Sequence, residues 1–451
     1  MGCERVEDAT STSYLPSGRP ERTRRRVVIT GLGAVSPIGH GREGVWQGVR
    51  AGRSAVRKLT HFDASAFRSQ LAAEIVDFDP AATLGSVAHR RLDRFSQLAL
   101  ASAQQAWEDA RLGADHLDRE RMGVSLGSAL GGVAKAEAEC GVYLSRGLRR
   151  VDPALALCVF VGAGPCNIAI EFGLTGPCTG NGNSCASGTV AIGDALRMIQ
   201  HDEADVMLAV GAEAPLAPLC YGAFAIIRAM SARNDDPEAA SRPFDKDRDG
   251  FVMAEGAATL VLEERDHALA RGAPICAEVL GYALTNDGYH MTAPRPDGRS
   301  AARAMRLALR DAGLPPEAVD HINAHGSSTP LNDAIESAAI AEVFGEHASR
   351  IPVSGTKGLH GHPLGAAGAL EALLCTLALE HDFLPPTVNL ECPGEGCTLD
   401  YVGPQGRPQR VNTILSNSFG FGGINACVIL GRATADPHLR SSLSRTASGE
   451  G

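Results

Sequence analysis

The sequence predicts an α/β protein whose mostly parallel sheets are covered by helices on both faces. Short apolar segments alternate with helical stretches of ten to fifteen residues, which is the pattern of such folds. The alternation starts again after about residue 272 with the segment PICAEVLGYAL, which predicts two similar halves. At 451 residues the chain is long enough for a duplicated fold of this kind.

The first predicted element is a buried strand at residues 26–33, where a β-branched run ends in glycines. Apolar residues at spacings of three and four predict helices at about residues 94–111, 187–201, 299–313 and 333–344. Short apolar runs predict further strands at residues 205–211, 257–263, 351–354 and 426–430. We therefore expect an N-terminal half at residues 26–272 and a C-terminal half at residues 273–432.

The two ends of the chain are polar. Residues 1–25 and 433–451 are rich in Ser, Thr, Pro and Arg, so we expect both to be disordered tails. The N-terminal tail lacks the apolar stretch of a signal peptide, and no later run is expected to reach the length of a membrane span. These features predict a soluble, cytoplasmic protein without a membrane partner.

The composition is that of an ordinary globular protein, with 44% hydrophobic and 21% charged residues. A formal net charge of -10 argues against a general nucleic-acid binder, which needs a basic surface to meet phosphate. The twelve cysteines form no C-x-x-C pair and no cluster with zinc-ligand spacing. We therefore expect reduced thiols and no metal site or cofactor.

One cysteine stands where a nucleophile could be made. Cys185 lies in the small-residue segment Gly182–Val190, which leads directly into a helical pattern. The N-H groups and dipole at a helix N-terminus favour a thiolate and predict a lowered pKa for this thiol. The alternative is a small cysteine buried in a tight packing corner, which is the commoner case for cysteines in general.

Three further segments favour the catalytic interpretation. His325 in NAHGSSTP and His362 in TKGLHGHPLGAAG each stand where a strand gives way to a glycine-rich turn before a helix, a frequent place for active-site residues of α/β folds. The loop Ser416–Asn425 contains glycines that let backbone N-H groups approach a ligand closely. Each histidine taken alone would more often be a structural hydrogen-bonding group.

Taken together, these segments resemble the elongating β-ketoacyl-[acyl carrier protein] synthases of the synthase II type. The resemblance runs from about residue 26 to 432 and includes the cysteine elbow, the His-Gly-x-x-Thr-Pro segment, the Lys-x-x-x-Gly-His segment and the Asn-Ser-Phe-Gly-Phe-Gly-Gly loop, in the family's order. The segment Arg242–Phe251 adds a further long match. The resemblance implies a thiolase fold with layers in the order αβαβα.

The resemblance also implies a mechanism. Cys185 matches the nucleophile that carries the acyl chain, and His325 and His362 match the pair that holds the malonyl thioester oxygen during decarboxylation. The oxyanion of the condensation step is expected to meet the backbone N-H groups of Cys185 and Phe421. Lys357 is one of only four lysines in the chain and matches the family's active-site lysine, with Glu336 as its expected ion-pair partner.

The resemblance further implies a pocket and partners. Phe421 matches a gate to the acyl pocket, and Leu130 and Phe419 are expected to line that pocket. Acyl carrier protein is the expected partner, and a homodimer or a heterodimer with a chain-length factor is the expected assembly. The basic residues at positions matching the docking site, or near it, are Arg90, Arg91, Arg149, Arg150 and Arg228.

Other members of this fold group fit the sequence less well. A thiolase would need a second catalytic cysteine in the loop Ser416–Asn425, which has none. Starter-unit and chalcone-type synthases use a Cys, His, Asn set, whereas position 362 is histidine. A non-catalytic chain-length factor lacks the nucleophile, which is present here as Cys185. The elbow reads Asn-Ser-Cys-Ala-Ser where many primary-metabolism relatives have Thr-Ala-Cys, so both fatty-acid and type II polyketide pathways stay open.

Overall fold

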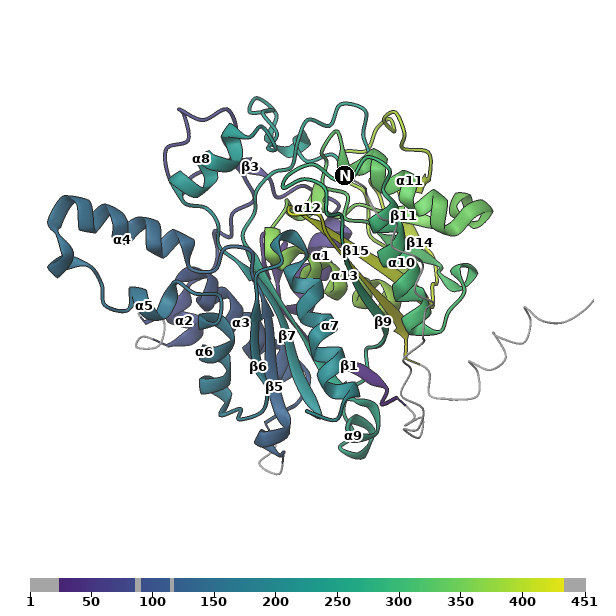
Figure 1. Cartoon of the computed structure of the whole chain (residues 1–451), viewed down its shortest axis with the longest axis horizontal. Coiled ribbons are helices and arrows are strands. Elements are labelled where there is room, and N and C mark those ends of the chain that lie inside the picture. Colours follow the sequence, from purple (N-terminus) through teal and green to yellow (C-terminus); the bar gives the residue numbers. More distant parts are fainter. Residues whose placement is uncertain (1–23, 86–90, 114–116, 434–451) are drawn as a thin grey trace, which may run out of the picture.

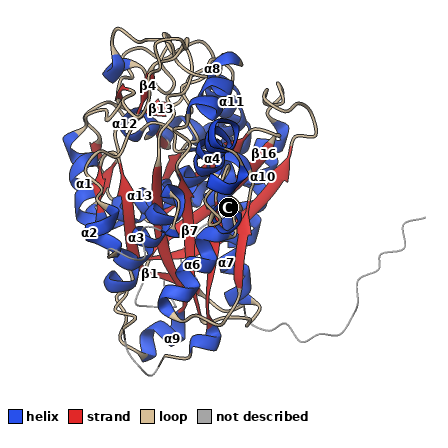
Figure 2. Cartoon of the chain, turned by 90° about the vertical axis from the view of Figure 1, so that its left-hand side faces the viewer, coloured by secondary structure: helices blue, strands red, loops and turns tan. Residues whose placement is uncertain are grey.

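The computed structural model describes residues 24–85, 91–113 and 117–433. The described chain forms one continuous mixed sheet with helices around and between its two halves (Figure 1). In the view turned by 90° the strands run roughly upright through the molecule, and loops gather at the upper end with helices α8, α11 and α12 (Figure 2). The architecture is α/β, as the alternation of strands and helices predicts.

Both halves of the sheet use the same strand order. Numbered along the chain within each half, the principal strands lie in the spatial order 1-5-4-2-3. In the N-terminal half these are β1 (Val27–Ser36), β8 (Gly256–Glu264), β7 (Val206–Glu213), β5 (Met122–Gly127) and β6 (Cys178–Asn181). In the C-terminal half they are β9 (Ala277–Asn286), β16 (Ile424–Arg432), β15 (Thr413–Gly420), β10 (His321–Asn323) and β11 (Pro352–Ser354), with β13 (Asp400–Tyr401) beyond. The repeated order is the mark of a duplicated fold.

The pairing of strands changes from the middle of the sheet to its ends. β5 pairs in parallel with β6 and β7, and β10 pairs in parallel with β11 and β15. Between these groups the pairs are antiparallel, including the β1–β9 pair that joins the halves. Short strands complete the set: β2 (Gly39–His40), which pairs with β1, and the pairs β3 (Arg57–Lys58) with β4 (Leu71–Ala72) and β12 (Phe383–Leu384) with β14 (Arg407–Pro408).

Helices form three layers around the two half-sheets. Helices α3 (Arg94–Asp109) and α6 (Ala163–Phe172) cover the N-terminal half, and α10 (Arg299–Ala312) and α11 (Asn332–Phe344) lie on the outside of the C-terminal half. Helices α7 (Ser187–Gln200) and α13 (Ala367–His381) contact strands of both halves and each other, so they form the middle layer. The remaining helices are α1 (Gly41–Ala51), α2 (Pro80–Leu84), α4 (Val133–Arg146), α5 (Leu155–Cys158), α8 (Pro218–Ile226), α9 (Arg265–Ala270) and α12 (Lys357–His360).

The buried core follows these layers. Along β7 the side chains of Val206, Leu208 and Val210 pack toward α3, while Met207 and Ala209 pack toward α7 and α13. A strand covered on both faces is apolar without interruption, which explains the run DVMLAVG. A third cluster lies between the C-terminal strands and helices α10 and α11. The layer order is therefore αβαβα.

The middle helices touch through small residues at their N-terminal ends. A Cβ added to Gly188 of α7 would lie 2.7 Å from the backbone nitrogen of Ala369, and one added to Gly368 of α13 would lie 2.1 Å from the Thr189 hydroxyl oxygen. The two contacts are reciprocal: Gly188 faces Ala369, the residue after Gly368, and Gly368 faces Thr189, the residue after Gly188. Glycine is required here by the close approach of the helices.

Helix α13 corrects one expectation from the sequence. Together with the preceding turn it forms an apolar stretch of 18 residues, Leu364–His381, that is long enough to cross a membrane. The prediction that no run reaches this length was wrong. This stretch is 89% buried inside the fold, between the two half-sheets, so its composition is that of a core helix.

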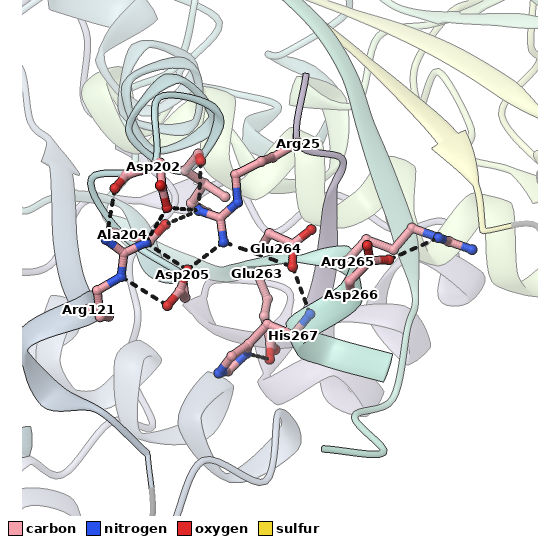
Figure 3. Close-up of polar contacts among 11 residues, drawn as sticks. Arg25, Arg121, Asp202, Ala204, Asp205, Glu263, Glu264, Arg265, Asp266 and His267 are labelled. Carbon is pink, nitrogen blue, oxygen red and sulfur yellow. Dashed lines mark hydrogen bonds and ion pairs between the residues drawn. The ribbon is translucent and has the colours of Figure 1, made fainter. Parts of the chain in front are cut away.

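An ion-pair cluster fastens the segment before β1 to the N-terminal half (Figure 3). Arg25 pairs with Asp205 at 2.5 Å and with Asp202 at 3.2 Å, and Arg121 pairs with the same two carboxylates. Arg24 pairs with Asp311 of α10. Arg24 and Arg25, which the sequence assigned to a disordered tail, are therefore held by the fold. The rest of the predicted tails, residues 1–23 and 434–451, lies outside the described residues.

The elements predicted from the sequence are confirmed within a few residues. The strand at the start and the four helices correspond to β1, α3, α7, α10 and α11, and the later strands correspond to β7, β8, β11 and β16. The boundary between the halves near residue 272 stays a prediction. It falls between α9 and β9.

Candidate active site

Cys185 lies at the entry to the middle helix α7. It follows β6 in a short 3-10 turn, Ser184–Ala186, that passes directly into the helix. Ser184 has a φ of 52°, in the left-handed region that non-glycine residues rarely adopt, so the elbow stores backbone strain. The entry to α13 repeats this geometry: Leu364 has a φ of 40° and opens a 3-10 turn before the helix.

The thiol of Cys185 does not have the lowered pKa that its helix position predicts. The residue is only 8% exposed, and burial raises the pKa of the thiol to about 11. The Ser184 hydroxyl, the Lys357 ammonium and the backbone N-H of Phe421 act in the opposite direction, but burial outweighs them. The thiol is therefore neutral at physiological pH, and its proton must leave as the sulfur reacts.

His325 and His362 face each other beside this thiol. Their ring centroids are 5.3 Å apart with the planes at 78°. Each follows a strand of the C-terminal half: His325 comes two residues after β10, and His362 follows β11 and the short helix α12. Burial and the nearby Lys357 ammonium lower the pKa of both imidazoles well below the ordinary value. Both rings are therefore neutral at physiological pH and can each donate one N-H to an oxygen.

Lys357 is buried beneath the histidines, and its partner is Glu371. Its ammonium donates to the backbone oxygen of His325 at 2.5 Å and forms an ion pair with the carboxylate of Glu371 on α13. The predicted ion pair between Lys357 and Glu336 was wrong. Burial raises the pKa of Glu371 to about 7, while the adjacent ammonium acts to lower it.

Glu336 instead holds the backbone that carries His325. From helix α11 its carboxylate accepts the N-H of His325 at 2.8 Å and the N-H of Gly326 at 2.9 Å. It also accepts from the side chain of Asn417 on β15 at 3.1 Å. Glu336 is fully buried. Its hydrogen bonds link the His325 loop to β15, the strand that leads to the glycine-rich turn.

The glycine-rich turn between β15 and β16 closes over the cysteine elbow. A Cβ added to Gly420 would lie 3.1 Å from the backbone nitrogen of Cys185, so this position must stay small. The N-H of the next residue, Phe421, is directed at the Cys185 thiol. The turn thus brings the backbone of Phe421 next to that of Cys185, and the assignment of their N-H groups to an oxyanion hole stays a prediction.

A cavity of about 330 Å³ joins these groups. The residues predicted from the sequence that line it are Cys185, Arg228, His325, His362, Phe419 and Phe421. Phe251 packs edge-on against His362, and Phe224 stacks on Phe421 at a centroid distance of 6.2 Å. The wall beside the thiol is therefore aromatic and apolar, which suits an acyl chain.

Leu130 does not line this cavity but belongs to the same apolar cluster as Cys185, Phe224 and Phe251. Its assignment to the acyl pocket stays a prediction. Glu336 and Lys357 also lie outside the cavity wall, behind the histidines.

The predicted docking arginines are not all gathered at the cavity. Arg228 is exposed, has a φ of 57° and lines the mouth. Arg149 and Arg150 are exposed on the turn after α4, which projects from the body (Figure 1). Arg91 is exposed before α3, and Arg90 lies outside the described residues.

Sequence reasoning missed two buried carboxylates. Glu371 interrupts the apolar run GALEALLCTLAL, and Glu213 ends the apolar strand β7. A single charge within a buried run is the signal that could have found them, because such a charge needs a partner. Among the described residues no group of His, Cys, Asp and Glu is arranged to hold a metal ion.

Comparison with known proteins decides the family. Residues 24–268 match "Beta-ketoacyl synthase, N-terminal domain", and residues 276–391 match "Beta-ketoacyl synthase, C-terminal domain". The chain belongs to the β-ketoacyl synthase family. It is therefore an acyltransferase that forms carbon-carbon bonds, as the resemblance implied.

Relatives from two kinds of pathway are similar to nearly the same degree. The chain is 47% identical over 409 residues to 3-oxoacyl-[acyl-carrier-protein] synthase 2 of Coxiella burnetii, covering 91% of this chain and 99% of the relative. It is 45% identical to the actinorhodin polyketide putative beta-ketoacyl synthase 1 of Streptomyces coelicolor, covering 90% of this chain and 88% of the relative. This β-ketoacyl synthase thus works in fatty-acid or polyketide biosynthesis.

A solved structure supports the thiolase fold. A type II polyketide synthase acyl-carrier protein in complex with its ketosynthase bound to the hexaketide matches this chain with a TM-score of 0.84 and 35% identity. The match covers 91% of this chain and 100% of the solved chain. The fold predicted from the sequence is confirmed.

Proposed function

We propose that the protein is an elongating β-ketoacyl-[acyl carrier protein] synthase that joins a Cys185-bound acyl chain to a malonyl unit with loss of carbon dioxide. The observation that carries this proposal is the meeting of Cys185, His325 and His362 on one apolar cavity. A thiolase is not favoured, because the glycine-rich loop holds no second cysteine.

In the first half-reaction the Cys185 sulfur attacks the thioester carbonyl of an acyl carrier protein. The thioester bond to the carrier breaks, and the carrier thiol leaves with the proton lost from Cys185. The oxyanion formed on the way meets the N-H groups of Cys185 and Phe421. Because the resting thiol is neutral, a proton acceptor must act as the sulfur attacks, and a neutral imidazole of the histidine pair, which lines the same cavity, is suited to this role.

In the second half-reaction malonyl carrier protein occupies the cavity mouth. The bond to its carboxylate breaks, carbon dioxide leaves, and the enolate oxygen accepts an N-H from each neutral imidazole. The enolate carbon then attacks the Cys185 thioester, and the thiolate leaves. Lys357 adds positive charge beneath the pair and is tied to the His325 backbone, so it orients the histidines and needs no proton exchange.

Two variants separate the half-reactions. Cys185→Gln should abolish condensation, because no other cysteine of the described residues lines the cavity, yet it should still release carbon dioxide from malonyl carrier protein. Adding His325→Ala or His362→Ala to Cys185→Gln should reduce this release by roughly 10² to 10³, the effect of losing one oxyanion donor. Intact mass spectrometry reports the acyl-enzyme and carbon dioxide release reports the second step. Elongation by Cys185→Gln would refute the proposal.

We also propose that the working form is a dimer, located in the cytoplasm. Helices α4, α5 and α6 and the turns between them present large exposed apolar side chains: Tyr143, Leu144, Leu148, Leu157, Phe160 and Ile170. Exposed apolar side chains of this number, next to a sheet whose edge strand is β6, fit a protein partner. A homodimer and a heterodimer with a chain-length factor are both consistent with it. Native mass spectrometry of the protein alone, and mixed with any homologue that lacks the cysteine and is encoded nearby, distinguishes them.

A further inference from the structure

Glu213 is a buried carboxylate that the reaction itself does not use. It ends β7, is fully buried and accepts four hydrogen bonds. One carboxylate oxygen accepts from the Ser128 hydroxyl at 2.9 Å and from the N-H of Leu130 at 3.2 Å. The other accepts from the N-H of Ala129 at 2.6 Å and from the N-H of Gly365 at 3.0 Å. All its contacts are therefore with the segment after β5 and with the entry to α13.

These two segments both contribute a leucine to the apolar cluster that contains Cys185. The first holds Leu130, which shares an apolar cluster with Cys185. The second holds Leu364, which lines the cavity in a strained left-handed conformation directly after His362 and Pro363. The segments are also in contact, since a Cβ added to Gly365 would lie 2.3 Å from the Ala129 nitrogen and 2.6 Å from the Glu213 carboxylate. Glu213 is the group that fixes one against the other.

The other half of the molecule uses the same device at a catalytic residue. Gly127 pairs with β6 and β7 in the same way that Asn323 pairs with β11 and β15, so these two positions are equivalent. Counting two and three residues onward, Ala129 is equivalent to His325 and Leu130 to Gly326. In the C-terminal half a buried carboxylate, Glu336, accepts the N-H groups of His325 and Gly326. Glu213 accepts the N-H groups at the matching positions, Ala129 and Leu130.

We infer that Glu213 is a positioning residue that sets which acyl chains the enzyme accepts, by fixing Leu130 and Leu364 around the Cys185 thiol. This inference rests on the proposed function. Donors on both carboxylate oxygens leave little freedom for the backbone of Ser128–Leu130 and of Gly365, so Leu130 behind the cavity and Leu364 on its wall are held in place. A fixed wall discriminates between chains by volume, whereas a loosened wall yields to a longer chain.

Glu213→Gln tests the role with little change of shape. The amide has one acceptor oxygen in place of two, and its NH2 group can donate to the Ser128 hydroxyl oxygen but cannot accept from a backbone N-H. At least one of the three backbone N-H groups therefore loses its acceptor. The chain-length preference is the ratio of kcat/KM for the best acyl carrier protein to kcat/KM for one whose acyl chain is four carbons longer. Losing one buried hydrogen bond should reduce this ratio by roughly fivefold. Carbon dioxide release, measured with Cys185→Gln, should change less than twofold.

Glu263→Gln is the matched control. Glu263 is equally buried and also binds side chains, Arg271 and His267, but it lies opposite Val206, at the far end of the β7–β8 pair. That end is roughly 24 Å from Glu213 along the strand. The control should cost stability without altering the chain-length ratio. Ser128→Ala, which removes one donor to Glu213 and also the acceptor of the Gly131 N-H at 2.9 Å, supplies a second variant if Glu213→Gln does not fold.

The outcomes are separable. If the wild-type protein does not condense acyl and malonyl carriers at all, the proposed function fails. If it does, an unchanged ratio in Glu213→Gln or, where that variant is unfolded, in Ser128→Ala overturns the inference. A proportional loss of both half-reactions overturns it as well, because that is the result of a general loss of folded protein.

Discussion

At the scale of single residues, the active site depends on charges that are buried and paired. Lys357 and Glu371 are both buried and form an ion pair. The lysine ammonium also donates to the backbone oxygen of His325. A buried ion pair contributes little net stability, but removing one partner leaves an uncompensated charge. Burial and, after it, the positive charge of Lys357 lower the pKa of both imidazoles and keep them neutral.

This pairing leads to a double-variant prediction. Lys357→Met should lower the free energy of unfolding by about 3–5 kcal/mol, because it leaves the Glu371 carboxylate unpaired. The double variant Lys357→Met with Glu371→Leu should regain most of that loss while staying inactive in decarboxylation. Denaturant unfolding measures the stabilities. As the control, the double variant Glu336→Gln with Lys357→Met should be no more stable than Lys357→Met alone. If this control restored the stability, the assignment of Glu371 as the partner of Lys357 would be contradicted.

The residue scale is also where sequence reasoning reached furthest and then stopped. Cys185, His325 and His362 stand in local turn motifs, so they could be selected as candidates from their neighbours in the chain, and all three line one cavity. The partner of Lys357 could not, because α13 and α11 each bring a glutamate toward the same loops and only the fold decides which carboxylate meets the ammonium. The prediction of a lowered pKa for Cys185 was wrong for a related reason. The helix terminus can be seen in the local sequence, but the burial that raises this pKa depends on the whole site.

At the scale of elements, the site depends on the close crossing of α7 and α13. The first helix begins just after Cys185 and the second begins just after the His362 loop, so their spacing sets the distance between nucleophile and histidine. The spacing is small because glycines face the partner helix. Helix α13 has apolar residues on all sides, which explains why a search for one apolar face did not predict it.

Gly368→Ala tests this crossing. The new methyl group would lie 2.1 Å from the Thr189 hydroxyl oxygen and 2.7 Å from the Thr189 nitrogen, so the helices must separate. We expect a loss of roughly 1–3 kcal/mol in stability, typical of overpacking, and slower acyl transfer to Cys185. Gly44→Ala in α1 is the control: its methyl group meets atoms only at 3.6 Å and beyond, so it should stabilise by roughly 0.5–1 kcal/mol. Equal effects of the two variants would refute the role of the crossing.

A second element-scale prediction concerns the segment before β1. The guanidinium groups of Arg121 and Arg25 lower the pKa of Asp205 to about 2, and this carboxylate joins that segment to β7 (Figure 3). Because the folded-state pKa is below the unfolded one, the stabilisation is present above about pH 4 and is lost as the pH falls toward 2. Asp205→Asn should therefore lower Tm at pH 7, and the difference from wild type should shrink between pH 5 and pH 3. A constant difference over that range would contradict this explanation.

At the scale of the whole molecule, the fold is one arrangement used twice. The strand order, the strained 3-10 entries to α7 and α13, and the carboxylates that hold the segments after β5 and β10 all recur. Yet the proposed chemistry is divided, with the proposed nucleophile Cys185 on one half and His325 and His362 on the other. The sequence indicated the duplication only by a restart of its pattern, because equivalent positions hold different residues, such as Ala129 and His325.

The net charge of -10 raises a question at this scale, since the carrier proteins expected as partners are acidic too. Two negative bodies repel at long range, so a local positive patch is needed for docking. Arg228 stands at the cavity mouth, whereas Arg149 and Arg150 lie on the projecting turn after α4. If all three arginines serve docking, changing Arg228 or changing Arg149 with Arg150 should affect carrier-bound substrates more than small acyl thioesters.

We therefore expect Arg228→Glu, and separately Arg149→Glu with Arg150→Glu, to raise KM for acyl carrier protein several-fold while barely changing turnover of small acyl thioesters. The wild-type preference for carrier-bound substrate should also fall as salt rises, because exposed charges are screened over about 8–10 Å at physiological ionic strength. Arg306→Glu is the matched control, an exposed arginine on α10 that pairs with Glu342 and does not line the cavity. It should leave both substrates unaffected. A similar loss on both substrate types in either docking variant would mean that those arginines support the fold or the site, and the docking assignment would be withdrawn.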